Sequence, residues 1–307
     1  MLASLTPTRF SNPDWIFERK FDGQRVLAFV SGRRVQLMSR NRKDLNQTYP
    51  ELVEALGRQL PPSFVVDGEV VAFSGSQTSF AKLQERMQIR SHREASESKV
   101  RVFFYLFDLL YLDRYETSAL PLLERKELLR GALRFDGPIR FTAHRQKHGE
   151  RYFAEACARG WEGLLAKRAD SRYVSGRSPH WLKFKCSQGQ ELVIGGFTEP
   201  RGSAQGFGAL LVGYYKDGNL RYAGKVGTGF SVPTRLKLRR RMNRMRRTEP
   251  PFLDEVGERH VTWIAPQLIG EFAFSEWTRD GKLRHPSFRG LRYDKRPREI
   301  VRERATL

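Results

Sequence analysis

The segment Glu18-Arg19-Lys20-Phe21-Asp22-Gly23-Gln24-Arg25 combines residue types that could activate a lysine beside a bound phosphate. A lysine amine is nucleophilic only after it loses its proton, and neighbouring cations and desolvation both favour that loss. Arg19 and Arg25 supply such cations, and Asp22 is a hard oxygen donor suited to Mg²⁺. Gly23 allows a ligand to approach the backbone closely. On this segment alone, a nucleophilic site and an ordinary charged hairpin are equally supported.

Two later segments carry charges in a pattern that fits an anionic ligand. The pattern of residues 64–73 predicts a strand with Asp67 and Glu69 on the face opposite its apolar residues, because side chains alternate with a period of two. In a second predicted strand, 181–185, Lys183 and Lys185 share one face. Like charges on one face of a strand repel each other. An anion between the two lysines would relieve this repulsion, and a solvated edge strand would tolerate it.

The first half of the chain reads as a mixture of strands and helices that would position these groups. Apolar periodicity predicts two strands within 14–40, helices over 48–60, 121–133 and 149–159, and a strand over 163–167. Residues 102–112 are nearly all apolar, as expected of a central strand buried on both faces. The charged run 90–99 predicts a loop.

After residue 186 the sequence changes to short strands separated by glycines. Residues 187–190 predict a hinge, and the strands fall at 191–198, 209–216, 220–226, 261–264 and 268–277. One helix, 233–247, lies between the third and fourth strands. This pattern predicts a small five-stranded barrel of the OB type. We therefore expect two domains, 1–188 and 189–307.

The overall charge favours a polyanionic partner. The 307 residues contain 55 Lys and Arg against 34 Asp and Glu, a formal net charge of +21, and nucleic acid is the simplest partner for such an excess. An anionic membrane surface would require an amphipathic anchor helix, which the pattern does not predict. Basic residues nearly encircle the predicted helix 233–247, which favours salt-sensitive contacts with phosphates.

Other functional classes have no support in the sequence. Cys157 and Cys186 predict neither a disulfide framework nor a thiolate metal site. The six histidines have no metal-ligand spacing, and neither a P-loop nor a G-x-G-x-x-G fingerprint occurs. No signal peptide or membrane-spanning run is predicted, so we expect a cytoplasmic protein.

The segment Lys20–Arg25 resembles K-x-D-G-x-R, the signature of the covalent nucleotidyltransferases, which include ATP-dependent DNA ligases, RNA ligases and mRNA capping enzymes. The other motifs of that superfamily follow in order: Ser39-Arg40-Asn41, Asp67-Gly68-Glu69, Phe104-Tyr105-Leu106-Phe107-Asp108, Glu162-Gly163-Leu164-Leu165-Ala166-Lys167, Trp181-Leu182-Lys183-Phe184-Lys185 and Arg292-Tyr293-Asp294-Lys295. Segments 193–198, 206–211, 222–230 and 283–292 are similar to the ligase module of bacterial LigD-type end-joining ligases. Ser287 departs from the wider ligase family, in which many members carry arginine there.

The resemblance implies a three-step reaction. Lys20 attacks the α-phosphorus of ATP, pyrophosphate leaves, and a lysyl-AMP phosphoramidate forms. The AMP then passes to the 5′-phosphate of a DNA nick, and the neighbouring 3′-hydroxyl displaces it to seal the strand. Asp22 and Glu162 are the expected ligands of Mg²⁺ or Mn²⁺. The charge that builds on oxygen in such transfers must be neutralised by positioned groups.

The resemblance also assigns the remaining contacts to nucleotide and DNA. These are Glu18 at the adenine edge, Phe107 on the adenine face, Glu69 at the ribose, Lys183 and Lys185 at the α-phosphate, Arg25 and Arg40 at the ribose side and the nick 5′-phosphate, and Arg177 at the phosphates.

The fold implied is α+β: a nucleotidyltransferase (adenylation) domain of antiparallel sheets with flanking helices, followed by an OB-fold β-barrel domain. The implied partners are nicked or broken double-stranded DNA and end-binding, polymerase or nuclease repair proteins or domains. We expect a monomer with no membrane partner, in the bacterial cytoplasm and associated with the nucleoid, acting in DNA repair and recombination by non-homologous end joining.

Three alternatives stay open at this point. An RNA ligase or a GTP-dependent capping enzyme would share the chemistry. A non-catalytic nucleic-acid-binding OB protein would need none of Lys20, Glu69, Glu162, Lys183 and Lys185. Because Lys20 lies so early, the chain is either a minimal ligase or a module of a longer polypeptide.

Overall fold

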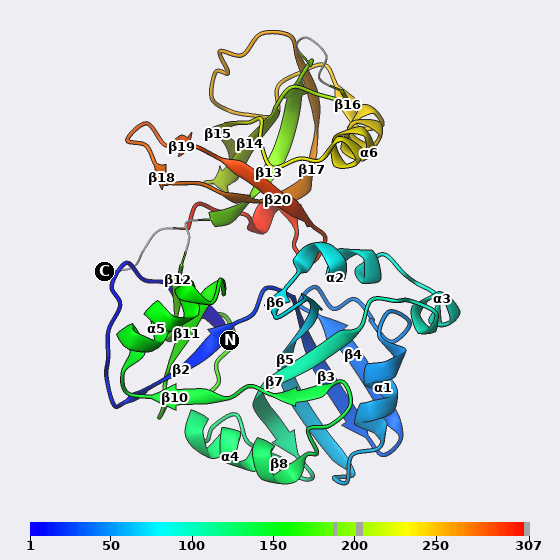
Figure 1. The fold of residues 1–307 in the computed structure, drawn as a ribbon, viewed down its shortest axis with the longest axis vertical. Coiled ribbons are helices and arrows are strands. Elements are labelled where there is room, and N and C mark those ends of the chain that lie inside the picture. Colours follow the sequence, from blue (N-terminus) through cyan, green and yellow to red (C-terminus); the bar gives the residue numbers. More distant parts are fainter. Residues whose placement is uncertain (187–188, 201–204, 304–307) are drawn as a thin grey trace. The chain divides into compact units, whose positions relative to one another are not determined.

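The computed structural model describes residues 1–186, 189–200 and 205–303. Contacts between Cα atoms divide these residues into two compact units, one containing Met1–Cys186 and one ending at Glu303 (Figure 1). The expected domain boundary between residues 188 and 189, and half of the expected hinge 187–190, lie outside the described residues. Within the described part of the chain, no helix is both long enough and apolar enough to cross a membrane.

The first sheet of the first unit carries the segment with Lys20. Its strand order is β1 (Leu2–Leu5), β12 (Arg177–Lys185), β11 (Gly163–Arg168), β2 (Trp15–Lys20) and β10 (His144–Gln146). One face packs under helix α5 (Gly149–Ala158), where Phe17, Leu164 and Phe184 are fully buried. That apolar layer forces the alternate residues of β2, β11 and β12 onto the other face.

The second sheet carries the acidic and aromatic segments. Its path is β4 (Arg34–Ser39), β3 (Gln24–Ser31), β5 (Ser63–Ser74), β7 (Val102–Leu112) and β8 (Tyr115–Glu116), with β6 (Gln77–Thr78) beside β5 and β9 (Ile139–Phe141) beside β7. The expected alternation in β5 is confirmed: its apolar face joins the main core, and Asp67 lies on the opposite face. Helices α1 (Pro50–Gly57), α2 (Phe80–Met87) and α4 (Leu122–Ala132) complete this half of the unit.

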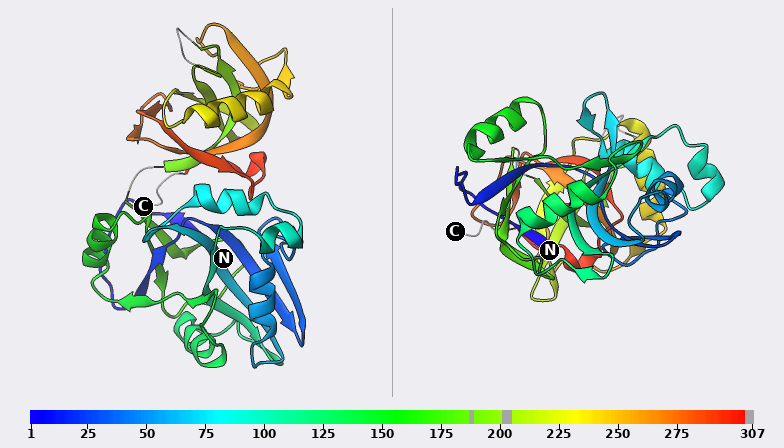
Figure 2. Two further views of the ribbon diagram at one scale, coloured as in Figure 1. Left: turned by 45° about the vertical axis from the view of Figure 1, so that its right-hand side comes forward. Right: turned by 90° about the horizontal axis from the view of Figure 1, so that it is seen from below.

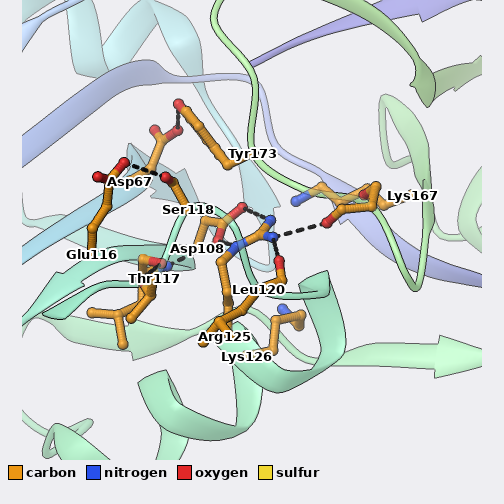
Figure 3. Close-up of polar contacts among 12 residues, drawn as sticks. Asp67, Asp108, Glu116, Thr117, Ser118, Leu120, Arg125, Lys126, Lys167 and Tyr173 are labelled. Atoms are coloured by element: carbon orange, nitrogen blue, oxygen red, sulfur yellow. Dashed lines mark hydrogen bonds and ion pairs between the residues drawn. The ribbon is translucent and has the colours of Figure 1, made fainter.

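Helix α4 is joined to β7 by a buried ion pair. The Arg125 guanidinium donates to both carboxylate oxygens of Asp108, at 2.7 and 2.9 Å, and both side chains are fully buried (Figure 3). The same guanidinium donates to the carbonyls of Leu120 and Ser171. Four bonds to one arginine therefore connect the start of α4, the strand β7 and the segment that follows β11.

Three predictions for this unit are wrong. The range 14–40 contains three strands, β2, β3 and β4, because the chain turns at residues 21–23 before the hairpin. The run 90–99 contains a short helix, α3 (His92–Ser96), which buries Ala95 beside α1. Cys157 and Cys186 form a disulfide with a Cα–Cα distance of 5.3 Å. Their separation of 29 residues gives no sign that the fold brings the end of α5 to the end of β12.

The second unit is a small barrel-like sheet around its own apolar core (Figure 2). The order is β15 (Asn219–Val226), β14 (Leu210–Lys216), β13 (Gly189–Thr198) and β17 (Val261–Ala273), with β16 (Arg246–Arg247) and β20 (Ser287–Arg292) also paired to β17. The predicted fourth and fifth strands are one strand, because Pro266 lies where the β13–β17 register shifts and a bulge accommodates its missing N–H. The fifth long strand is β20, within the segment assigned to the last motif.

Helix α6 (Val232–Asn243) ends four residues earlier than expected, and its charge is unevenly distributed. Leu238 and Met242 are buried in the barrel core. Arg235 donates to the carbonyls of Phe207, Gly208 and Gly227, and Arg239 pairs with Glu199. The exposed cations are Lys237, Arg240 and Arg241 on the helix, Arg244 directly after it, and Arg246 and Arg247 in β16. The expectation that basic residues nearly encircle this helix is therefore wrong on its barrel side.

Arg125→Met tests the buried pair of α4. The substitution leaves the buried Asp108 carboxyl group without its partner, so we expect the free energy of unfolding to fall by about 3–5 kcal/mol. Urea unfolding of the whole chain measures this loss. Arg58→Met removes an exposed arginine from an ion pair with Glu54 in the same unit and should cost about 0–1 kcal/mol. Equal losses in the two variants would contradict this account of α4.

Candidate active site

The site face of the first sheet presents its charges in rows across three strands. Gly163 of β11 lies between Lys20 of β2 and Lys185 of β12. In the next row, Leu165 lies between Glu18 and Lys183. The expected placement of Lys183 and Lys185 on one face of β12 therefore brings both lysines to the face that carries Lys20.

Gly163 is required at the centre of the first row. Its φ is +149°, and a Cβ atom there would lie 1.9 Å from the Phe184 carbonyl oxygen. Any side chain would thus push β12 away from β11. The glycine keeps the two lysine-bearing strands in register.

Lys20 forms an ion pair with Glu162, the residue immediately before β11. Lys20 Nζ lies 2.5 Å from Glu162 Oε2, and both side chains are about one-fifth exposed. Burial lowers the pKa of the Lys20 amine, but the ion pair with Glu162, helped by Asp22 and Glu69, outweighs burial and raises the pKa above its ordinary value. A raised pKa favours the protonated form of an amine, which is not nucleophilic.

Arg25 is held by Asp67 across β3 and β5. Its Nε and Nη2 atoms lie 2.9 and 2.5 Å from the two Asp67 carboxylate oxygens, and Tyr173 donates its hydroxyl to Asp67 at 2.8 Å. Burial raises the pKa of Asp67, but Arg25 outweighs it and holds that pKa below its usual range. Glu69 lies directly opposite Arg25 in the register. The structure thus brings Arg25 and Glu69 together, with the guanidinium already paired.

The Phe107 ring is almost completely covered. It is 6% exposed, with Lys167 Nζ 4.3 Å and Arg25 Cζ 5.5 Å from the ring centroid. Trp181 packs against it edge-on, with the centroids 5.9 Å apart. A purine could stack on this ring only if one of the two cations moved, so its stacking role stays a prediction.

Glu18 is the most buried of the predicted nucleotide-binding acids. Its side chain is 1% exposed and lies between Lys126 Nζ, at 2.5 Å, and Lys167 Nζ, at 2.6 Å. Burial raises the pKa of Glu18, but the two lysines outweigh it and hold the pKa below its usual value. The carboxylate is therefore an ion enclosed by two cations.

Arg40 and Arg177 lie outside the strand rows that hold Lys20, Lys183 and Lys185. Arg40 is exposed in the turn after β4. Arg177 begins β12 and donates to the Ala3 carbonyl, whereas the lysines of the site lie at the other end of that strand. Their contacts with DNA or phosphate remain predictions.

Sequence reasoning missed the buried charges on α4. Arg125 and Lys126 occupy helix positions that face the core together with Leu122 and Leu129. A cation on the apolar face of an amphipathic helix is itself a signal of a buried partner. Residues 121–133 carry that signal at Arg125 and Lys126.

Glu162→Gln tests what controls the Lys20 amine. Removing the negative charge should lower the pKa of Lys20, because the ion pair that outweighs burial is lost. Competitive amine labelling across a pH series, with mass spectrometry of the Lys20 peptide, measures the change without nucleotide. The expected result is stronger labelling at a lower pH than in the wild type. Glu85→Gln, exposed on α2, is the control. An unchanged Lys20 profile in Glu162→Gln would refute the electrostatic assignment.

Comparisons with known proteins assign a family to the chain. A family model described as ATP dependent DNA ligase domain matches residues 1–185, and one described as ATP dependent DNA ligase C terminal region matches residues 203–295. A solved structure described as mycobacterial DNA ligase D complexed with ATP and MES is 35% identical in sequence, covers 98% of both chains, and has a TM-score of 0.67.

Two curated relatives cover nearly the whole chain. The multifunctional non-homologous end joining DNA repair protein LigD of Mycobacterium tuberculosis is 38% identical over 298 residues, 94% of this chain and 37% of the relative. The multifunctional non-homologous end joining protein LigD of Pseudomonas aeruginosa is 36% identical over 303 residues, 95% of this chain and 35% of the relative. The chain thus spans little more than a third of the length of these relatives.

The first family model alone covers more than half of the chain, and the solved ligase structure aligns with nearly all of it. The predicted fold class, a nucleotidyltransferase unit of antiparallel sheets followed by an OB-type barrel, is confirmed. The chain belongs to the family of ATP-dependent DNA ligases.

Proposed function

We propose that Lys20 carries the adenylate in this DNA ligase, within an adenylation domain of residues 1–188 that precedes an OB-fold domain of residues 189–307. The observation that supports this most strongly is the row Lys20–Gly163–Lys185, with Lys183 in the next row of the same face. One amine would attack the α-phosphorus of ATP. The other two would neutralise the charge that grows on the phosphate oxygens as pyrophosphate leaves.

The proton on Lys20 must leave before this attack. Glu162 holds that proton by raising the pKa of the amine. Asp22 and Glu162 would hold a Mg²⁺ or Mn²⁺ ion together with phosphate oxygens and water, since Mg²⁺ uses only one or two protein carboxylates beside a nucleotide. The ion would supply positive charge to the phosphates.

The remaining proposed roles follow the placement of each residue. Glu69, opposite Arg25, would contact the ribose, and Glu18 would meet the adenine edge. Phe107 would stack on adenine after Lys167 or Arg25 moves off its ring. The ribose side and the nick 5′-phosphate would be contacted by Arg25 and Arg40. The nucleotide phosphates would be contacted by Arg177.

The biological setting proposed is double-strand break repair by end joining in the bacterial cytoplasm, at the nucleoid. Its support is the similarity over 94–95% of this chain to proteins named for non-homologous end joining. The substrate would be nicked or broken double-stranded DNA with 5′-phosphate and 3′-hydroxyl ends. End-binding, polymerase and nuclease proteins or domains would act with the chain, which we expect to be monomeric.

Incubation with α-labelled ATP and Mg²⁺ tests the covalent step. We expect an acid-labile, alkali-stable AMP adduct on the wild type, because a phosphoramidate has that stability profile. Lys20→Ala should abolish the adduct and leave affinity for nicked duplex within about twofold, since one charge among the many that contact phosphate is lost. Lys82→Ala, exposed on α2, is the control. Adduct on Lys20→Ala at the wild-type level would sink the assignment, and labelling by GTP alone would favour a capping-type enzyme.

The exposed face of α6 predicts how DNA binding responds to salt. Arg240→Gln/Arg244→Gln removes two exposed cations and leaves Arg235 and Arg239 in their internal bonds. If both arginines contact phosphates, the slope of log K against log salt for nicked duplex should become shallower by about 1–2. Arg93→Gln/Arg114→Gln, exposed in the first unit, removes the same charge as a control. Identical slopes for wild type and the α6 variant would remove this helix from the DNA interface.

A further inference from the structure

Two neighbouring residues of α4 hold the two sheets between which the predicted site residues lie. Arg125 binds Asp108, which follows Phe107 on β7 of the second sheet. Lys126 binds Glu18, two residues before Lys20 on β2 of the first sheet. Figure 3 shows both side chains leaving the helix at consecutive positions. The helix thus fixes both the strand of the nucleophile and the strand of the predicted stacking ring.

Lys126 has two acceptors and almost no exposure. Its Nζ donates to Glu18 Oε1 at 2.5 Å and to the Thr142 carbonyl at 3.0 Å, and its side chain is 1% exposed. The Thr142 carbonyl belongs to the link between β9 and β10. One ammonium group therefore joins α4, β2 and the segment beside β10.

The surroundings of Glu18 contain more polar atoms than the protein satisfies. Among the described buried side-chain atoms without a hydrogen bond are Thr142 Oγ1, His144 Nδ1 and Trp181 Nε1. His144 lies opposite Glu18 in the β10–β2 register, and Trp181 lies opposite Lys167. Unsatisfied buried polar atoms each cost free energy. His144 pairs with the Glu18 strand, the Thr142 carbonyl accepts from Lys126, and the Trp181 ring lies beside Lys167. The surroundings of the Glu18 ion pairs are therefore more polar than an ordinary apolar core.

Lys126 can keep a positive charge beside Glu18 even if Lys167 moves away. Lys167 lies 2.6 Å from the second Glu18 oxygen and only 4.0 and 4.3 Å from the ring centroids of Trp181 and Phe107. If Lys167 moves to uncover Phe107, Glu18 keeps a cation only through Lys126. A buried carboxylate without a cation would take up a proton or turn toward water.

We propose that Lys126 is a positioning residue of the nucleotide site, which keeps the Glu18 carboxylate directed toward the bound base and would hold it there if Lys167 moved off the Phe107 ring. This inference rests on the proposed adenylation of Lys20 and adds a residue that no motif of the sequence contains. Lys126 itself touches no reacting atom. It acts through the Glu18 carboxylate.

A double-mutant cycle on the adenylation step tests this role. The variants are Lys126→Met, Glu18→Gln and the two combined, each assayed for the KM for ATP and for the rate of adduct formation at saturating ATP. We expect Lys126→Met to raise the KM about tenfold and to change the saturated rate much less, because a displaced contact to the base weakens binding. In the Glu18→Gln background the same change should alter the KM by less than about twofold, since its target is already gone.

Two controls separate positioning from folding. Arg86→Met removes another buried cation of the same unit, which binds Glu51 and the Thr48 carbonyl, so it should lower the thermal midpoint without changing the KM. For Lys126→Gln we expect the same rise in the KM as for Lys126→Met. This variant replaces Lys126→Met if the methionine variant does not fold. The combined variant removes both charges of the ion pair together. We therefore expect it to be more stable than Lys126→Met alone.

Three results would overturn the inference: a wild-type KM in Lys126→Met or Lys126→Gln, independent effects of the two substitutions, or an equal rise in the KM in Arg86→Met. Failure of the wild type to form an AMP adduct would instead contradict the proposed function, and the two failures are therefore distinguishable.

Discussion

Phe17, Leu164 and Phe184 bury one face of the β2–β11–β12 sheet beneath α5, and this packing fixes the direction of every charged side chain on the other face. A shift of one residue in any of the three strands would exchange the two faces and place lysines in the apolar layer. Hydrophobic burial therefore specifies the register, and the register places Lys20, Lys183 and Lys185 on one face. The close approach at Gly163 keeps the rows in line.

Charge burial is the second organising feature of the first unit. Asp108 with Arg125, and Glu18 with Lys126 and Lys167, lie inside the protein with almost no exposure. Buried ion pairs are weak contributors to stability compared with apolar residues of the same size, so their presence is better explained by specificity of arrangement. In this unit they connect α4 to both sheets and set the electrostatic surroundings of β2. Lys20 also forms an ion pair, with Glu162.

Much of this arrangement could be predicted from the sequence where side-chain alternation is regular. The faces of β5 and β12, the central strand β7 and the helices near α4 and α5 all follow from periodicity. Pro266 concealed the continuity of β17, since a proline normally ends a central strand and only the bulge permits it. The disulfide between Cys157 and Cys186 depends on tertiary proximity that no local pattern carries. Lys126 lies in no motif, and its partner is 108 residues away.

Helix α6 shows that a count of positive charges overstates what a surface offers to DNA. Arg235 uses its guanidinium on three backbone carbonyls and Arg239 pairs with Glu199, so these two arginines support the barrel. A lysine at position 235 would keep the formal charge but lose the planar fork that reaches several acceptors at once. Evolutionary exchange between arginine and lysine should therefore be free along the outer side of this helix and restricted on its inner side. Basic residues with the same formal charge would then meet two different requirements along a single helix.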